Sequence, residues 1–142
     1  RGPIYDQLDL RNDADMGFKI IRAGDLDTMG TDAAVDVVQR RVGDMPVYLS
    51  IPIDVADPAF APGTGTPEAG GVTSRELLRM LRKLRGLNIV GADVVEVAPA
   101  YDHAEITSVA AATIVFDLVS LMVAARAEAA QPRADRAAIA QS

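Results

Sequence analysis

Three carboxylates stand near the ends of two apolar segments of this sequence. Asp54 closes the apolar run of residues 45–54, and Asp57 follows three positions later. Glu96 lies near the end of the second run, residues 87–99. In open α/β sheets ligands gather beyond the carboxyl ends of the strands, and carboxylate oxygens suit divalent cations. The sequence therefore raises the hypothesis of a cation site where these two segments end.

Each of these acids also has a structural interpretation. The Asp57 side chain would cap the turn before Pro58, and Asp54 would then only mark the strand end. Glu96 would share a face with Val94 if its strand alternates, and an acid on a covered face needs a partner. That partner is either a cationic substrate or an arginine of a neighbouring helix, and the sequence leaves both open.

Further polar groups are available at His103 and in the segment 64–66. His103 is the only histidine and precedes a predicted helix, where a structural hydrogen bond is the alternative to catalysis. Thr64 and Thr66 could offer hydroxyls or backbone N–H groups to a ligand, or could only shape turns. The chain has no cysteine, which excludes thiolate metal sites and a cysteine nucleophile. It also lacks the glycine-rich nucleotide motifs and the G-x-S-x-G elbow.

The composition of the chain limits the kinds of molecule that it is expected to bind and the cellular locations in which it is expected. The net charge of −6 gives no electrostatic footprint for nucleic acid. No signal peptide is visible, so a cytoplasmic location is expected. The apolar segment 106–127 carries Asp117 near its centre, which would cost roughly 2.5–3.5 kcal/mol in a bilayer, so a helix packed on a sheet is favoured over a membrane span. Because the chain begins at Arg1 rather than Met, it is expected to be a fragment.

The elements that must position these residues alternate between strands and helices. Strands are expected at 18–26, 45–54 and 87–99, and helices at 31–43, 73–86 and 102–130. This order predicts an α/β fold, a three-layer α-β-α sandwich with a parallel sheet. A sheet of three strands leaves an open edge, so the fold is expected to be incomplete in this chain. Residues 1–130 form the predicted domain, within which 1–18 is expected to be loop with one helical turn, and 131–142 is expected to be a flexible tail.

The segment "SIPIDVADPAFAPGTGTPEAGG" (50–71) resembles the third signature of the ureohydrolases, the arginase and agmatinase family. The resemblance continues through "GADVVEVAPAYDHAEIT" (91–107), which is close to the agmatinase-like branch, and through "RGPIYDQLDL" and "GFKII" near the start. It covers most of residues 1–127. The resemblance implies an arginase-like fold, of which this chain would be the C-terminal portion.

The family signature begins S-x-D-x-D-x-x-D-P, and its first two acids bind a pair of manganese ions. By this resemblance Asp54 matches a manganese ligand, Glu96 matches the acid that receives the substrate guanidinium, and Asp57 matches a structural position. The implied reaction is hydrolysis of a small guanidino compound, of the agmatine or guanidinobutyrate type, to urea and an amine, with two manganese ions activating a water. The resemblance also implies a homo-oligomer.

Two departures from the family pattern limit what this chain can do. Pro52 occupies the position of the first acid, brings no oxygen ligand and removes a backbone N–H from what looks like a central strand. The family's D-A-H-x-D motif and its upstream metal-binding histidine are absent. The chain alone is therefore expected to be inactive, with the other ligands on a missing N-terminal half or on a separate chain of a split enzyme. The alternative is a metal-free pseudoenzyme that uses the fold for assembly or regulation.

Overall fold

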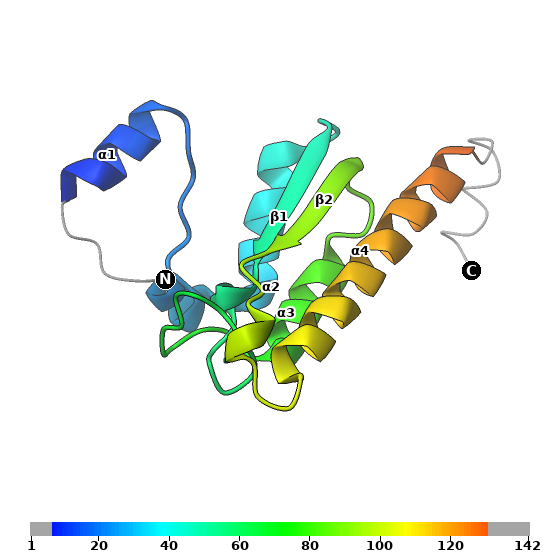
Figure 1. Cartoon of the computed structure of the whole chain (residues 1–142). Coiled ribbons are helices and arrows are strands. Elements are labelled where there is room, and N and C mark those ends of the chain that lie inside the picture. The colour runs from blue at the N-terminus through cyan, green and yellow to red at the C-terminus, as the bar shows by residue number, and fades with distance from the viewer. Residues whose placement is uncertain (1–6, 131–142) are drawn as a thin grey trace.

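The computed structural model describes residues 7–130 of the chain, which form helices and a small parallel sheet (Figure 1). The helices are α1 (Gln7–Asp15), α2 (Ala23–Val42), α3 (Ser74–Lys83) and α4 (Ile106–Ala130). The strands are β1 (Val47–Pro52) and β2 (Ile89–Val95). Short 3₁₀ helices follow each strand, η1 (Ile53–Val55) and η2 (Pro99–Tyr101). The expected α/β class with a parallel sheet is confirmed.

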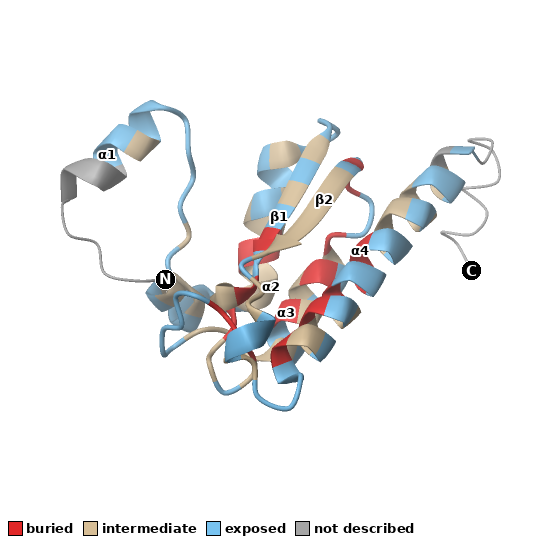
Figure 2. Cartoon of the chain, viewed as in Figure 1, coloured by how far each residue is buried: buried red, intermediate tan, exposed pale blue. Residues whose placement is uncertain are grey.

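One face of the sheet carries the core. Strands β1 and β2 pair in parallel, with Ile51 opposite Val94 and Pro52 opposite Val95. Helix α2 contacts α3, α3 contacts α4, and α4 contacts β2, so these helices form one layer on the sheet. The main buried side chains of this core are Val35, Ile51, Ile53, Leu77, Leu81, Leu84, Leu87, Ile89, Ile114 and Leu118 (Figure 2).

The local sequence explains where α3 begins. Thr73 Oγ1 accepts a hydrogen bond from the Glu76 N–H at 3.1 Å, and Glu76 Oε2 accepts one from the Thr73 N–H at 2.8 Å. This reciprocal arrangement is a capping box, which satisfies donors that a helix N-terminus otherwise leaves without partners. Leu77 and Leu81 are buried on the inner side of α3. The predicted helix start is confirmed.

Helix α4 is apolar around most of its circumference. By length and composition alone its segment Ile106–Glu128 could cross a membrane. Ile114 and Leu118 lie in the core, however, and Asp117 pairs with Arg82 of α3, with Nε and Oδ2 2.8 Å apart. We therefore interpret α4 as a core helix whose other side is exposed.

The N-terminal part of the chain departs from the sequence prediction. The strand expected at 18–26 is wrong, because 18–22 is irregular and α2 begins at Ala23. A strand needs a neighbour to hydrogen-bond with, and no described strand lies beside this segment. Within α2 the backbone kinks at Gly30, where φ is 77°, and the part that follows confirms the helix expected at 31–43. Where one helical turn within loop was expected in 1–18, the nine-residue helix α1 occupies 7–15, and residues 1–6 of that segment lie outside the described residues. The expected tail at 131–142 lies outside the described residues.

The position of Pro52 in β1 explains why the strand tolerates it. The Val47 N–H donates to the Asn88 carbonyl at 2.9 Å, so alternate residues of β1, including Ile51, direct their N–H groups toward β2. Pro52 follows Ile51 directly and so belongs to the other set of alternate residues. Its backbone nitrogen therefore faces the edge of β1 that is turned away from β2. Among residues 7–130 no strand pairs with that edge. The missing N–H removes no ladder bond to β2, and among the described residues β1 is an edge strand.

Candidate active site at the carboxyl edge of the sheet

The two strands end side by side and bring two acids to the same edge. Pro52 is opposite Val95 in the last pair of the ladder. Asp54 follows two residues after Pro52, within η1, and is half-buried. Glu96 follows directly after Val95 and is exposed. The carboxyl edge of the sheet therefore holds the two side chains that the sequence singled out from separate segments.

The backbone at Glu96 adopts a conformation that the sequence did not indicate. Its φ is +64°, in the left-handed region that non-glycine residues rarely occupy. This turn ends β2, so Glu96 does not continue the alternation that would place it on the covered face with Val94, and that expectation is wrong. No hydrogen bond or ion pair joins its side chain to another residue within 7–130. Residues held in such conformations cluster at functional sites, where the surrounding structure maintains them.

Asp54 is held by a residue of the following loop. Thr66 Oγ1 donates a hydrogen bond to Asp54 Oδ2 at 2.8 Å. The two residues are twelve positions apart, and the bond places Thr66 at the same edge of the sheet. Because one carboxylate oxygen is engaged, the orientation of the Asp54 side chain is restricted.

The loop that carries Thr66 is closed at its base by Asp57. The Asp57 carboxylate accepts hydrogen bonds from the Ala59 N–H and the Gly70 N–H, both at 2.9 Å. Its backbone N–H donates to the Val72 carbonyl at 2.9 Å. Gly71 lies so close to this base that an added Cβ would stand 2.5 Å from the carbonyl carbon of Ala56, the residue that follows η1. The structure thus gives Asp57 a place in the closure of the loop.

The middle of the same loop is fixed to the segment that follows β2 and to α4. The Gly63 carbonyl accepts from the Ala98 N–H at 2.8 Å, and the Gly63 N–H donates to Thr107 Oγ1 at 2.7 Å. Thr64, which is buried, forms a bridge with Val97. The loop is therefore held at its base, next to the segment that carries Asp54, and again in its middle, next to the segment that follows Glu96.

The N-terminus of α4 is anchored by Asp102. Its carboxylate accepts hydrogen bonds from the N–H groups of Thr107 and Ser108 at 3.0 and 2.9 Å. Burial raises the pKa of Asp102, but these hydrogen bonds outweigh it and hold the pKa well below its usual range. His103 donates only its backbone N–H to this carboxylate, and its side chain is exposed. The D-x-x-E pattern in the sequence indicated a helix start here but not the reach of Asp102 to Thr107 and Ser108.

The described residues do not fit a two-metal centre. Within residues 7–130 no three His, Cys, Asp or Glu side chains come together as a metal-binding group. Asp54 supplies one carboxylate, Pro52 supplies no oxygen, and both Asp57 oxygens accept hydrogen bonds in the loop. A manganese pair needs ligands beyond these.

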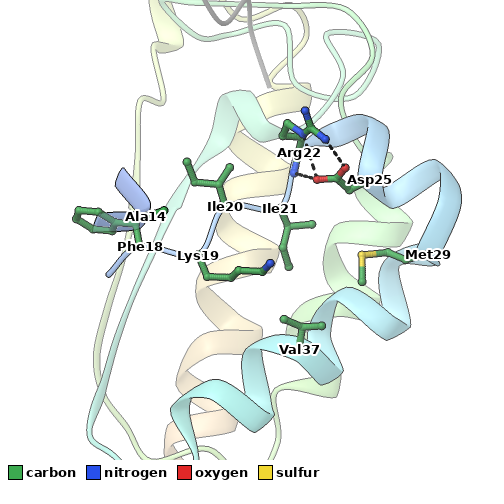
Figure 3. Close-up of a pocket in the computed structure, with 9 residues that line it drawn as sticks. All are labelled: Ala14, Phe18, Lys19, Ile20, Ile21, Arg22, Asp25, Met29 and Val37. Carbon is green, nitrogen blue, oxygen red and sulfur yellow. Dashed lines mark hydrogen bonds and ion pairs between the residues drawn. The ribbon is translucent and has the colours of Figure 1, made fainter. Parts of the chain in front are cut away.

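A separate hollow of about 580 Å³ lies between the segment 18–22 and α2 (Figure 3). Phe18, Ile20 and Met29 contribute apolar surface to it, and the Arg22–Asp25 ion pair lies at its side. None of the residues singled out from the sequence lines this hollow. It is therefore distinct from the candidate site.

Comparisons with known proteins agree on one family. The sequence model described as "Arginase family" matches residues 2–120. Putative agmatinase 3 of Schizosaccharomyces pombe is 60% identical over 123 residues, which are 87% of this chain and 30% of that protein. Agmatinase of Enterobacter sp. (strain 638) is 52% identical over 116 residues, which are 82% of this chain and 38% of that protein. The chain thus spans about a third of the length of these curated relatives.

Two solved structures share the fold. A hypothetical agmatinase from Burkholderia thailandensis aligns with a TM-score of 0.76 and 47% identity, covering 80% of this chain and 36% of that one. The proclavaminate amidino hydrolase from Streptomyces clavuligerus aligns with a TM-score of 0.80 and 44% identity, covering 88% of this chain and 42% of that one. These alignments confirm the expected fold and show how much more chain the solved relatives contain.

Proposed function

This chain belongs to the arginase family, and from that membership we propose that the protein hydrolyses a small guanidino compound, of the agmatine or guanidinobutyrate type, to urea and an amine. The observation that carries the proposal is the position of Asp54 and Glu96 at one carboxyl edge of an arginase-type sheet. The identity of 52–60% to proteins named agmatinase supports the choice of decarboxylated guanidino substrates over arginine.

Glu96 is the proposed site for the substrate guanidinium. A carboxylate and a guanidinium form paired, charge-assisted hydrogen bonds of fixed geometry. Glu96 is exposed, and no side chain within residues 7–130 neutralises it. A guanidinium that reaches the edge of the sheet would therefore find an available carboxylate.

We further propose that the complete enzyme uses a manganese pair and that this chain contributes Asp54 to it, with Thr66 holding that carboxylate. The remaining ligands would come from polypeptide that the relatives contain and this chain does not. On this proposal the chain alone is inactive. We also propose that the complete protein is a homo-oligomer, which the exposed apolar side of α4 would support.

Pro52 favours a second candidate function. It stands where the family pattern has an acid, and its side chain has no oxygen to offer a metal. A metal-free relative that keeps the fold for assembly or regulation would have no use for that acid. The two candidates differ in whether urea is ever produced.

The test measures urea release from agmatine, 4-guanidinobutyrate and arginine with manganese present. The chain is assayed alone and after co-expression with the part of the Burkholderia thailandensis agmatinase that it does not match. We expect no urea from the chain alone, urea from the combination, and a loss of at least about 100-fold with Glu96→Gln, because the substrate cation loses its charged partner.

The Pro52→Asp variant separates the two candidates. If the combination releases urea only with Pro52→Asp, the metal-free candidate is favoured, because the native chain then lacks a required ligand. If Glu96→Gln retains full activity, the proposed guanidinium site is wrong. Two tight manganese sites measured by calorimetry on the chain alone would contradict its proposed inactivity.

A further inference from the structure

The backbone of Gly63 joins the two segments that carry the candidate site. Its carbonyl accepts a hydrogen bond from the Ala98 N–H at 2.8 Å, and its own N–H donates to Thr107 Oγ1 at 2.7 Å. Ala98 comes two residues after Glu96, and Gly63 comes three residues before Thr66. One glycine therefore connects the loop, the segment that follows β2 and the first turn of α4.

Gly63 lies directly against Asp102. An added Cβ at Gly63 would stand 2.7 Å from the Asp102 Cβ and 2.9 Å from the Asp102 Cα. Asp102 is itself fixed to α4, because its carboxylate accepts hydrogen bonds from the N–H groups of Thr107 and Ser108 at 3.0 and 2.9 Å. The same helix turn thus supplies a close contact on one side of Gly63 and a hydrogen-bond acceptor for its N–H.

The backbone between β2 and α4 needs support of this kind. Glu96, Ala104 and Glu105 have φ angles of +64°, +51° and +60°, and among residues 7–130 no other non-glycine residue has a positive φ. Such conformations persist only where the surrounding structure maintains them. Because the bond from Ala98 to Gly63 follows Glu96 by two residues, its loss would let the Glu96 backbone relax toward the commoner negative φ.

The hydroxyl of Thr107 is the group that keeps Gly63 in place. Thr107 is 0% exposed, and its hydroxyl accepts from a backbone N–H that lies 44 positions away. The hydroxyls of Thr113 and Ser120, further along the same helix, bond only to carbonyls four residues earlier in α4. Without Thr107 Oγ1 the buried N–H of Gly63 would lose its acceptor and carry an uncompensated desolvation cost.

We propose that Thr107 is a positioning residue for the candidate site and that it acts through Gly63. Its hydroxyl fixes the loop that carries Thr66 against the segment that carries Glu96. The carboxylate that Thr66 holds, that of Asp54, and the carboxylate of Glu96 therefore keep one orientation relative to each other. The inference rests on the proposed function only for the part that Glu96 plays in binding a guanidinium.

The first test measures amide hydrogen exchange on the chain alone. The Ala98 N–H reports on the bond to Gly63, and the Leu81 N–H, within α3, reports on opening of the core. Thr107→Val keeps the shape of the side chain and removes its hydroxyl, whereas Thr107→Ser keeps the hydroxyl and loses a methyl group. Thr107→Val should lower the protection of Ala98 relative to Leu81 at least about tenfold, and Thr107→Ser less than about threefold. The control Thr113→Val removes a hydroxyl that bonds within α4 and should change this ratio less than about twofold.

The second test measures kcat/KM for agmatine after co-expression with the part of the Burkholderia thailandensis agmatinase that this chain does not match. Thr107→Val should lower kcat/KM at least about tenfold, because misplaced binding groups weaken catalysis, and Thr107→Ser should restore it to within about threefold of the native value. A role in stability alone predicts instead that both variants lose activity in proportion to their loss of unfolding free energy.

Three results would overturn the inference. They are an unchanged relative protection of Ala98 in Thr107→Val, an equal loss of that protection in Thr107→Ser, and an unchanged kcat/KM of Thr107→Val in an active combination. If the native combination releases no urea while the exchange results are as expected, the proposed function is contradicted and the positioning of the two segments by Thr107 stands.

Discussion

Thr66 donates its hydroxyl hydrogen bond to Asp54 across 2.8 Å and so joins the middle of a long loop to the end of β1. Thr66→Val removes the donor and should lower the free energy of unfolding by about 0.5–1.5 kcal/mol, the net contribution of a typical hydrogen bond. Thr66→Ser keeps the hydroxyl and serves as the control. Urea denaturation compares the three proteins, and equal stability of the Val and Ser variants would show that the bond contributes nothing.

Gly71 is required by close packing at the base of the same loop. An added Cβ would press on the backbone of Ala56 and on the backbone nitrogen of Asp57, neither of which can swing away. Gly71→Ala should therefore destabilise the chain by about 1–3 kcal/mol. Gly65→Ala is the matched control, because no atom lies within 4 Å of its added Cβ. Thermal unfolding measures both, and a Gly71→Ala variant as stable as Gly65→Ala would contradict the packing.

Asp102 should make the stability of the protein depend on pH in the acidic range, through its hydrogen bonds to the N-terminus of α4. Its folded-state pKa lies below the ordinary value of 3.8, so its contribution is fully present above 3.8 and is lost as the pH falls below that value toward the folded-state pKa. Asp102→Asn should flatten this acid limb in a plot of unfolding free energy against pH. Asp44→Asn, at an exposed position before β1, should leave the limb unchanged. If the unfolding free energy of Asp102→Asn fell just as steeply at low pH, groups other than Asp102 would be responsible for the pH dependence.

The ion pair between Arg82 and Asp117 should contribute more to stability than the more exposed pair between Arg85 and Glu128. The Asp117 side chain is 11% exposed, so Arg82→Ala leaves a largely buried carboxylate without this partner. We expect a loss of about 1–2 kcal/mol, reduced by the 62% exposure of Arg82. Arg85→Ala breaks the more exposed pair with Glu128 and should cost about 0–1 kcal/mol. Equal losses in chemical denaturation would contradict this ranking.

The exposed side of α4 offers a test of self-association. Phe116 is 71% exposed and stands between the exposed residues Val109 and Val123, on the side of α4 that is turned away from the core. If copies associate through this side, Phe116→Glu should raise their dissociation constant at least about tenfold, because a charge would be desolvated in an apolar contact. Arg40→Glu, on α2, is the charged control. Sedimentation of the co-expressed complex measures both, and unchanged association of Phe116→Glu would exclude this side.

Local patterns were sufficient to predict some elements but not others. The T-x-x-E spacing of Thr73 and Glu76 predicts the start of α3, because both partners of the capping box lie within one turn. The strand expected at 18–26 failed because its hydrogen bonds depend on a neighbour, and apolar composition does not reveal whether that neighbour exists. The alternating order of strand-like and helix-like segments was sufficient to predict the α/β class, and the family resemblance added that the fold is arginase-like.

At the candidate site, too, local patterns predicted some features, and features that depend on distant residues could not be predicted. Sequence reasoning could place Asp54 and Glu96 at the ends of parallel strands, where they lie. It could not predict the positive φ at Glu96, after which Val97 and Ala98 bond to Thr64 and Gly63 of a loop more than thirty positions earlier in the chain. The pairing of Tyr48 with Asp93 was also hidden, because it spans 45 positions and depends on a register irregularity after Val47.

The orientation of Pro52 has a consequence for solubility. An unprotected strand at the margin of a sheet can recruit like strands from other molecules and seed aggregates. Only Tyr48 and Ser50 have amide hydrogens to offer along that margin of β1, and a recruited strand would lose its next bond at the proline nitrogen. The residue that brings no metal-binding oxygen to this edge therefore also interrupts the row of donors that a recruited strand would need.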